Sequence, residues 1–149
     1  MKPSKFNVKE FLMITLITSI WVNLSEVFRY FVFVKPRTKA FFDFKEGIAE
    51  MNWGIFSVWG AWDMLLTVMV VITFWMFATL FGNNRRTVLL AGTFSWVFLF
   101  VLFWIATANM GLANWELLLI TLPLSWLEMV VASYIASKLY AKSLKTTAV

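Results

Sequence analysis

The residues best suited to chemistry in this chain are polar groups set within long apolar stretches. Asn23, Glu26 and Arg29 lie near the end of the first stretch, Asp63 lies in the second and Glu128 lies in the last. A carboxylate at the centre of a membrane helix costs at least about 2.5 to 3.5 kcal/mol on insertion scales, so an interior pairing partner or ligand must offset that cost. We therefore take these residues as the candidate proton- or ligand-binding site.

Arg29 has two ways of interacting with Glu26. It can pair with Glu26 across one helical turn, or it can extend to the headgroups, because it lies only about 7 Å from the expected end of its helix. In the second arrangement Glu26 and Asp63 would face each other as a like-charge pair, the kind of pair found in proton relays. A purely structural reading stays open, in which buried polar groups hold helices together by hydrogen bonds worth about 0.6 kcal/mol each.

Helical spacing places these polar residues on shared faces. Residues three or four apart lie on one side of a helix, and small residues within such a stripe let a neighbouring backbone approach closely. The stripe on the first predicted helix is Thr15, Ser19, Asn23, Glu26 and Tyr30. The stripe on the second is Gly60, Asp63 and Thr67, and the stripe on the fourth is Thr121, Ser125, Glu128, Ala132 and Ala136. We expect all three stripes to point into a helical bundle.

Depth along the helices favours a meeting of two acids. At a rise of about 1.5 Å per residue, Glu26 and Asp63 each lie about 12 Å from the outer end of their own helix. Glu128, counted in the same way, lies about 20 Å from the outer end of its helix and should be deeper. The sequence therefore predicts a shared polar cluster of Asn23, Glu26, Arg29 and Asp63 in the outer half of the bundle.

Composition indicates that these stripes cross a lipid bilayer. The 149 residues are 61% hydrophobic and only 14% charged, which leaves too little polar surface to cover a globule in water. A bilayer core needs about 20 apolar residues per helix. The segments that meet this length are Phe11 to Val34, Ile55 to Phe81, Thr87 to Ala108 and Trp115 to Tyr140. We predict a single all-α integral membrane domain over residues 1–149, with four transmembrane helices in an up-down-up-down bundle.

The connection between the first two spans is the least regular part of the sequence. Pro36 should end the first helix. From Thr38 onward, apolar residues recur at helical spacing opposite charged ones, which is typical of an amphipathic helix lying in the headgroup plane. Gly47 weakens that pattern, so an irregular loop is the alternative. The segment Gly82 to Arg86 predicts a tight turn between the second and third spans.

Basic residues are distributed unequally between the two ends of the predicted bundle. One side holds Lys2, Lys5, Lys9, Arg85, Arg86, Lys138, Lys142 and Lys145, and the other holds Lys35, Arg37, Lys39 and Lys45. Because cytoplasmic loops carry the excess of Lys and Arg, this distribution predicts that both termini are cytoplasmic. We expect the chain to lie in the cell (inner) membrane.

The absence of cysteine and histidine from the sequence limits its chemistry. Thiolate nucleophiles, Cys-ligated zinc or iron–sulfur sites and Ser-His pairs are excluded, and the usual haem ligand is missing. We expect no metal and no cofactor. A dyad of Glu26 and Asp63 is chemically conceivable, but no further catalytic group accompanies it, so we do not expect an enzyme. No exposed basic face suggests nucleic-acid binding.

These features leave two functional hypotheses. The first is a transporter or channel-like component that handles a proton, a cation or a small polar ligand at Asn23, Glu26, Arg29, Asp63 and Glu128. The second is a non-catalytic accessory or scaffold subunit of a membrane complex, which uses the same groups for assembly. The expected partners are the lipid bilayer, a second copy of the chain or another membrane protein.

Overall fold

The structure is built from helices alone over the part of the chain that it describes. The computed structural model describes residues 7–147, with side chains as far as Lys142; helix accounts for 85% of the structure, and no strand occurs in the described range. The α-helices are α1 (Val8–Arg29), α2 (Lys35–Phe41), α3 (Trp53–Phe81), α4 (Arg85–Trp96), α5 (Leu102–Asn109) and α6 (Trp115–Thr147), and the π-helical turns are η1 (Tyr30–Val34) and η2 (Val97–Val101).

Within the described part of the chain, four continuous helical segments are long and apolar enough to cross a membrane, as the sequence predicts. They are Val8–Phe41, Trp53–Phe81, Arg85–Asn109 and Trp115–Lys142. The first comprises α1, η1 and α2, and the third comprises α4, η2 and α5. These helices indicate a membrane-embedded protein.

Asparagine side chains define where three of these segments begin. The Asn7 side chain accepts hydrogen bonds from the first turn of α1. Asn52 and Asn84 each accept a hydrogen bond at 3.0 Å from the backbone N–H three residues later, at the starts of α3 and α4. Such caps satisfy N–H groups that have no partner within the helix. Gly82, at a φ of 77°, ends α3 and turns the chain toward α4.

The prediction that Pro36 ends the first helix is wrong. Pro36 lies in the first turn of α2, and the helix continues through it to Phe41. The turn η1 immediately precedes it, and there the backbone N–H of Lys35 donates to the carbonyl of Tyr30, five residues earlier. Proline is tolerated in the first turn of a helix, so the break in regularity falls on η1 and the segment remains helical.

The structure does not show an amphipathic helix between the first two spans. After Phe41 the chain forms a series of turns as far as Ala49, as the irregular-loop alternative describes. Asp43, Phe44 and Ala49 have φ values of 53°, 54° and 56°, outside the right-handed helical region. The apolar spacing over Phe41, Phe44 and later residues therefore belongs to a folded loop and not to one helical face.

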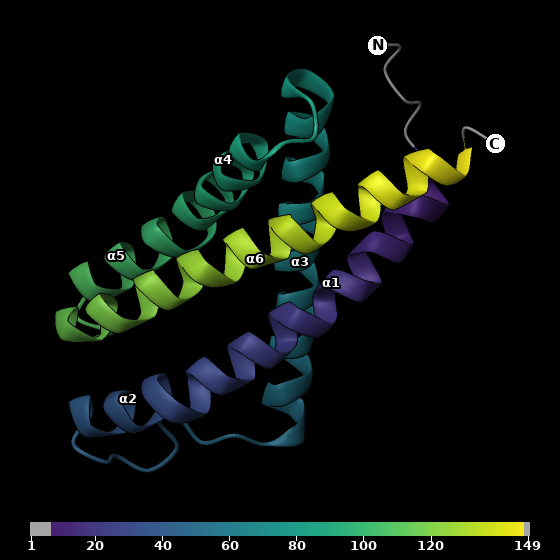
Figure 1. Cartoon of the computed structure of the whole chain (residues 1–149). Coiled ribbons are helices and arrows are strands. Elements are labelled where there is room, and N and C mark those ends of the chain that lie inside the picture. The colour runs from purple at the N-terminus through teal and green to yellow at the C-terminus, as the bar shows by residue number, and fades with distance from the viewer. Residues whose placement is uncertain (1–6, 148–149) are drawn as a thin grey trace.

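The helices are arranged around α6 and α3. Figure 1 shows α6 between α1 on one side and α4 with α5 on the other, while α3 crosses behind them at a steep angle. α6 packs against α1 and α4, and α3 packs against α1, α4 and α6. The described ends of α1 and α6 meet at one end of the molecule, opposite the turn that joins α5 to α6. The apolar core includes Val22, Val70, Phe74, Met129 and Ala132.

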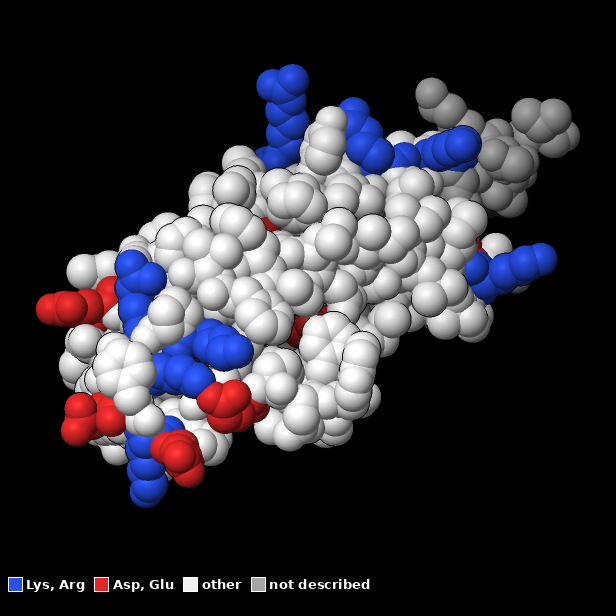
Figure 2. All heavy atoms as spheres, turned by 90° about the horizontal axis from the view of Figure 1, so that it is seen from below, with Lys and Arg blue, Asp and Glu red and all other residues white. Residues whose placement is uncertain are grey.

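The outer surface is suited to lipid. Leucine, isoleucine, phenylalanine and tryptophan side chains are exposed along every long helix. Figure 2 shows a broad uncharged surface, with Lys, Arg, Asp and Glu gathered toward its ends. In a bilayer these exposed apolar side chains would contact acyl chains, and the charged ends would lie among headgroups.

α4 and α6 approach each other closely where they cross at Gly92. A Cβ atom added to Gly92 would lie 2.7 Å from the Cα of Val130 and 3.0 Å from the backbone oxygen of Met129. These are backbone atoms, so a side chain at this position would fit only if the two helices moved apart. Gly92 is thus the small residue that permits this crossing.

Replacing Gly92 by alanine should destabilise the protein by about 1 to 3 kcal/mol, the usual cost of overpacking. The thermal unfolding midpoint in detergent, followed by circular dichroism, measures the effect. Gly60→Ala is the matched control, because nothing lies within 4 Å of a Cβ at that position, and alanine is otherwise the better helix former. Equal stability of the two variants would contradict the close crossing.

Candidate functional site

Arg29 lies at the centre of the candidate site. It is the last residue of α1, is 4% exposed, and forms an ion pair with Glu26 one turn earlier. Its guanidinium Nη1 lies 3.9 Å from Oε2 of Glu128, and its Cζ lies 4.7 Å from the centre of the Phe100 ring in η2. Arg29 therefore points into the bundle and pairs with Glu26, and it does not extend to the headgroups.

Glu128 joins α6 to α1. The carboxylate is 1% exposed, and its Oε2 accepts a hydrogen bond of 2.8 Å from the Ser25 hydroxyl, while its Oε1 has no hydrogen-bond partner. The indole N–H of Trp21 donates to the backbone oxygen of Glu128 at 3.1 Å. Trp21, Ser25 and Arg29 are four residues apart, so one face of α1 makes all of these contacts.

The expectation that Glu128 lies deeper than Glu26 is wrong. Glu128 contacts Ser25 and Arg29, the neighbours of Glu26 in the sequence. The depth of Glu26 was counted from Val34, but the helix continues to Phe41. From that end Glu26 lies about 22 Å along the helix, close to the value of about 20 Å for Glu128.

Asp63 contributes the third carboxylate, from α3. Asp63 is 5% exposed and lies within electrostatic reach of Glu26 and Arg29. Its backbone oxygen accepts a hydrogen bond from Thr67, but within residues 7–142 no hydrogen bond reaches its carboxylate. Among the described residues the buried Asp63 carboxylate therefore has no hydrogen-bond donor, an arrangement that is costly unless a ligand occupies the cavity.

A cavity of about 410 Å³ connects these groups. Asn23, Glu26, Arg29 and Asp63 are among its lining residues, and Glu128 lies beyond Arg29, outside the lining. The Asn23 amide also donates to the backbone oxygen of Ser19 at 2.8 Å. The structure thus brings four of the five predicted site residues to one cavity and the fifth into contact with them through Arg29.

Aromatic side chains form much of the remaining cavity wall. They come from η1, the first turns of α3, η2 and α5: Phe31, Phe56, Trp59, Trp62, Phe100, Phe103 and Trp104. Sequence spacing alone does not reveal them, since aromatic residues occur throughout the spans. Ser25 and Trp21 were missed for a different reason: they lie beside the predicted stripe, although their spacing of four from Arg29 is a usable signal.

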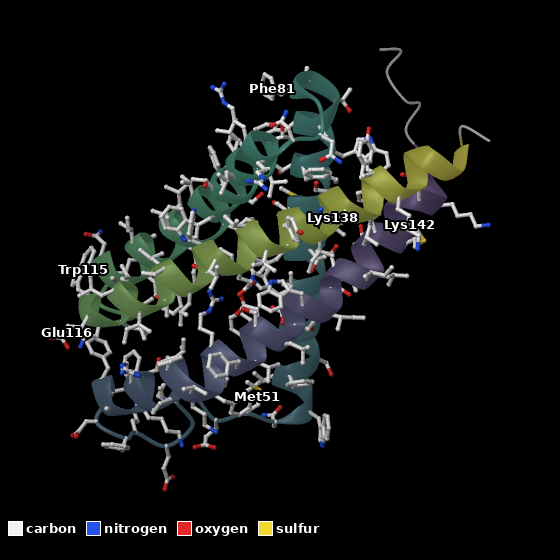
Figure 3. The ribbon with its side chains drawn as sticks, in the orientation of Figure 1. Met51, Phe81, Trp115, Glu116, Lys138 and Lys142 are labelled. Carbon is white, nitrogen blue, oxygen red and sulfur yellow. The ribbon has the colours of Figure 1, made fainter. Side chains whose placement is uncertain are left out.

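The loop before α3 forms part of the cavity wall. Gly47, Ala49, Glu50 and Met51 line it, and Figure 3 shows Met51 beside the start of α3, far from Phe81. The Tyr30 hydroxyl donates to the backbone oxygen of Ala49 at 3.1 Å. This bond attaches the loop to η1.

An ion pair between Lys39 and Glu50 also holds this loop, at the end of α2. The hydrogen bond from Lys39 and its positive charge lower the pKa of the Glu50 carboxyl. Because that pKa is lower in the folded protein, the pair stabilises the loop above the ordinary pKa of glutamate and is lost as the pH falls through the lowered value.

The cluster carries more negative than positive groups. With all groups ionised, Glu26, Asp63 and Glu128 contribute three negative charges and Arg29 one positive charge, a formal sum of −2. Within residues 7–142, no three acidic side chains lie close enough together to hold one metal ion. Comparison with protein-family models, with curated proteins and with solved structures finds no match to this chain.

Proposed function

We propose that this chain is a polytopic membrane protein that binds a proton or another cation at its buried acidic cluster, as a transporter or a channel-like component. The observation that carries the proposal is the Asp63 carboxylate, which is buried, faces a cavity and lacks a hydrogen-bond partner in the described chain. A positive occupant would offset both its desolvation and the excess negative charge.

The proposed topology has four helices crossing the bilayer alternately, with both termini in the cytoplasm. Lys9, Arg85, Arg86, Lys138 and Lys142 would then lie on the cytoplasmic side. Lys2 and Lys5 fall outside the described residues. The cavity, which the loop before α3 helps to line, would face the outer leaflet.

Current measurements on proteoliposomes adsorbed to a solid-supported membrane test this function. A jump in pH, or in sodium, potassium or ammonium concentration, should give a transient current for the wild type, lost in Asp63→Asn. Glu116→Gln is the matched control, because it removes one carboxylate outside this cavity. Currents that are the same in wild type, Asp63→Asn and empty liposomes would overturn the proposal.

The second candidate is a scaffold or accessory subunit. The observation that favours it is the contact set of Trp21, Ser25, Arg29 and Glu128, in which the protein's own groups satisfy much of the cluster and fix α1 against α6. This function predicts no current in any variant and a stoichiometric membrane partner after extraction in mild detergent.

A further inference from the structure

The charge around the cavity determines the sign of its occupant. Among the residues with described side chains Arg29 is the buried cation; it is already engaged by Glu26 and Glu128, and its ring contact is with Phe100. Asp63 faces the same cavity with no hydrogen-bond donor from the described chain. An anion entering here would meet an excess of carboxylates, whereas a cation would find a free one.

The wall of the cavity determines the chemical character of that cation. Trp59 precedes Asp63 by one helical turn, so both project from the same side of α3. Trp104 lines the cavity from α5, and Phe100 lines it from η2. Aromatic faces attract cations, and tryptophan does so most strongly. They also provide a large apolar contact surface.

An inorganic ion would fit this cavity poorly. Calcium takes six to eight oxygen ligands and magnesium an octahedral shell of oxygens, but most of the cavity wall is apolar and aromatic. The volume of about 410 Å³ lies within the range of about 300 to 1,000 Å³ typical of small-molecule sites. An uncharged apolar molecule would fill the space but would leave Asp63 without a counter-charge.

We infer that the ligand of this cavity is an organic cation with an apolar body, such as a quaternary ammonium or phosphonium compound. Its positive centre lies at Asp63, and its body lies against Trp59, Phe100 and Trp104. This inference rests on the proposed function and gives the class of cation that the site takes.

Equilibrium dialysis of labelled tetraphenylphosphonium against the purified protein in detergent tests the inference. Tetraphenylborate is the matched probe, since it has nearly the same shape and the opposite charge. The wild type should bind the phosphonium saturably and the borate not at all. Asp63→Asn should weaken phosphonium binding by about 30-fold, as expected when one partner of a buried charge pair is removed.

Matched variants separate loss of charge from loss of fold. Asp63→Glu keeps the charge and should retain binding, while Glu116→Gln, outside this cavity, should not change it. Trp104→Leu should weaken binding by about 3- to 10-fold through loss of a cation–π contact. Trp115→Leu, at an exposed position outside the cavity, should leave it unchanged.

The results distinguish failure of the ligand class from failure of the function. Equal phosphonium binding by wild type and Asp63→Asn, or borate binding as tight as that of the phosphonium, would overturn the organic-cation inference. If currents driven by protons or inorganic cations still depend on Asp63, the proposed function remains and only the ligand class is wrong. If those currents are also absent, both fail.

Discussion

Replacing Arg29 by methionine should lower the free energy of unfolding by about 3 to 5 kcal/mol, the usual cost of breaking a buried ion pair by removing one partner. Arg29 is 4% exposed and lies between the carboxylates of Glu26 and Glu128. Methionine fills a similar length of chain without the charge, and Glu26 and Glu128 would both lose the cation with which they pair. Unfolding titrations in mixed micelles, followed by tryptophan fluorescence, measure the loss.

A double variant tests whether uncompensated charge is the cause. Glu128→Gln keeps an oxygen that can accept the hydrogen bond from Ser25 but removes one of the two charges. Added to Arg29→Met, it should recover a large part of the lost stability, so the two effects should not be additive. Additive losses would show that the ion pair does not determine the cost.

Phe100→Ala should destabilise the protein by about 3 kcal/mol, near the lower end of the range for truncating a buried aromatic residue. Phe100 is 4% exposed, packs in the core and lies beneath the Arg29 guanidinium. The lower end applies because lipid tails are as apolar as the core, so lost contacts, and not transfer from water, determine the cost. The thermal unfolding midpoint measures it.

Phe98→Ala provides the matched control from the same π-helical turn. Phe98 is 56% exposed, so lipid can replace most of its contacts and its loss should cost much less. Phe100→Leu should fall between the two, because leucine fills part of the volume but removes the ring under Arg29. Similar losses for Phe98→Ala and Phe100→Ala would contradict the burial of Phe100.

Hydropathy was sufficient to predict the four spans, because a membrane imposes length and composition on any helix that crosses it. Helix ends were harder to predict. Asparagine caps begin α3 and α4 close to the predicted positions. The first helix, however, continues beyond Pro36, because a π-helical turn immediately precedes the helical turn that contains this proline. No local pattern in the sequence indicates that such a turn will absorb the irregularity.

The sequence predicted which residues form the candidate site and which helix faces carry them. It did not predict which side chains contact one another. The periodic placement of Glu26 and Asp63 indicated interior faces, and the structure brings both to one cavity. The level of Glu128 was wrong because it depended on the end of the first helix. Which aromatic residues surround the cavity depends on how α3 and α5 cross the other helices, and single-sequence periodicity does not encode that crossing.

The exposed ion pair of Lys39 and Glu50 has a consequence for access to the interior. Added salt screens pairs at the surface far more than charges that are buried, and this pair helps to hold the outer wall of the cavity. Rising ionic strength should therefore loosen the wall while leaving the attraction of Asp63 for its occupant nearly intact. The rates at which the proposed cation enters and leaves the cavity would then change together, and its equilibrium affinity for the site would stay close to constant.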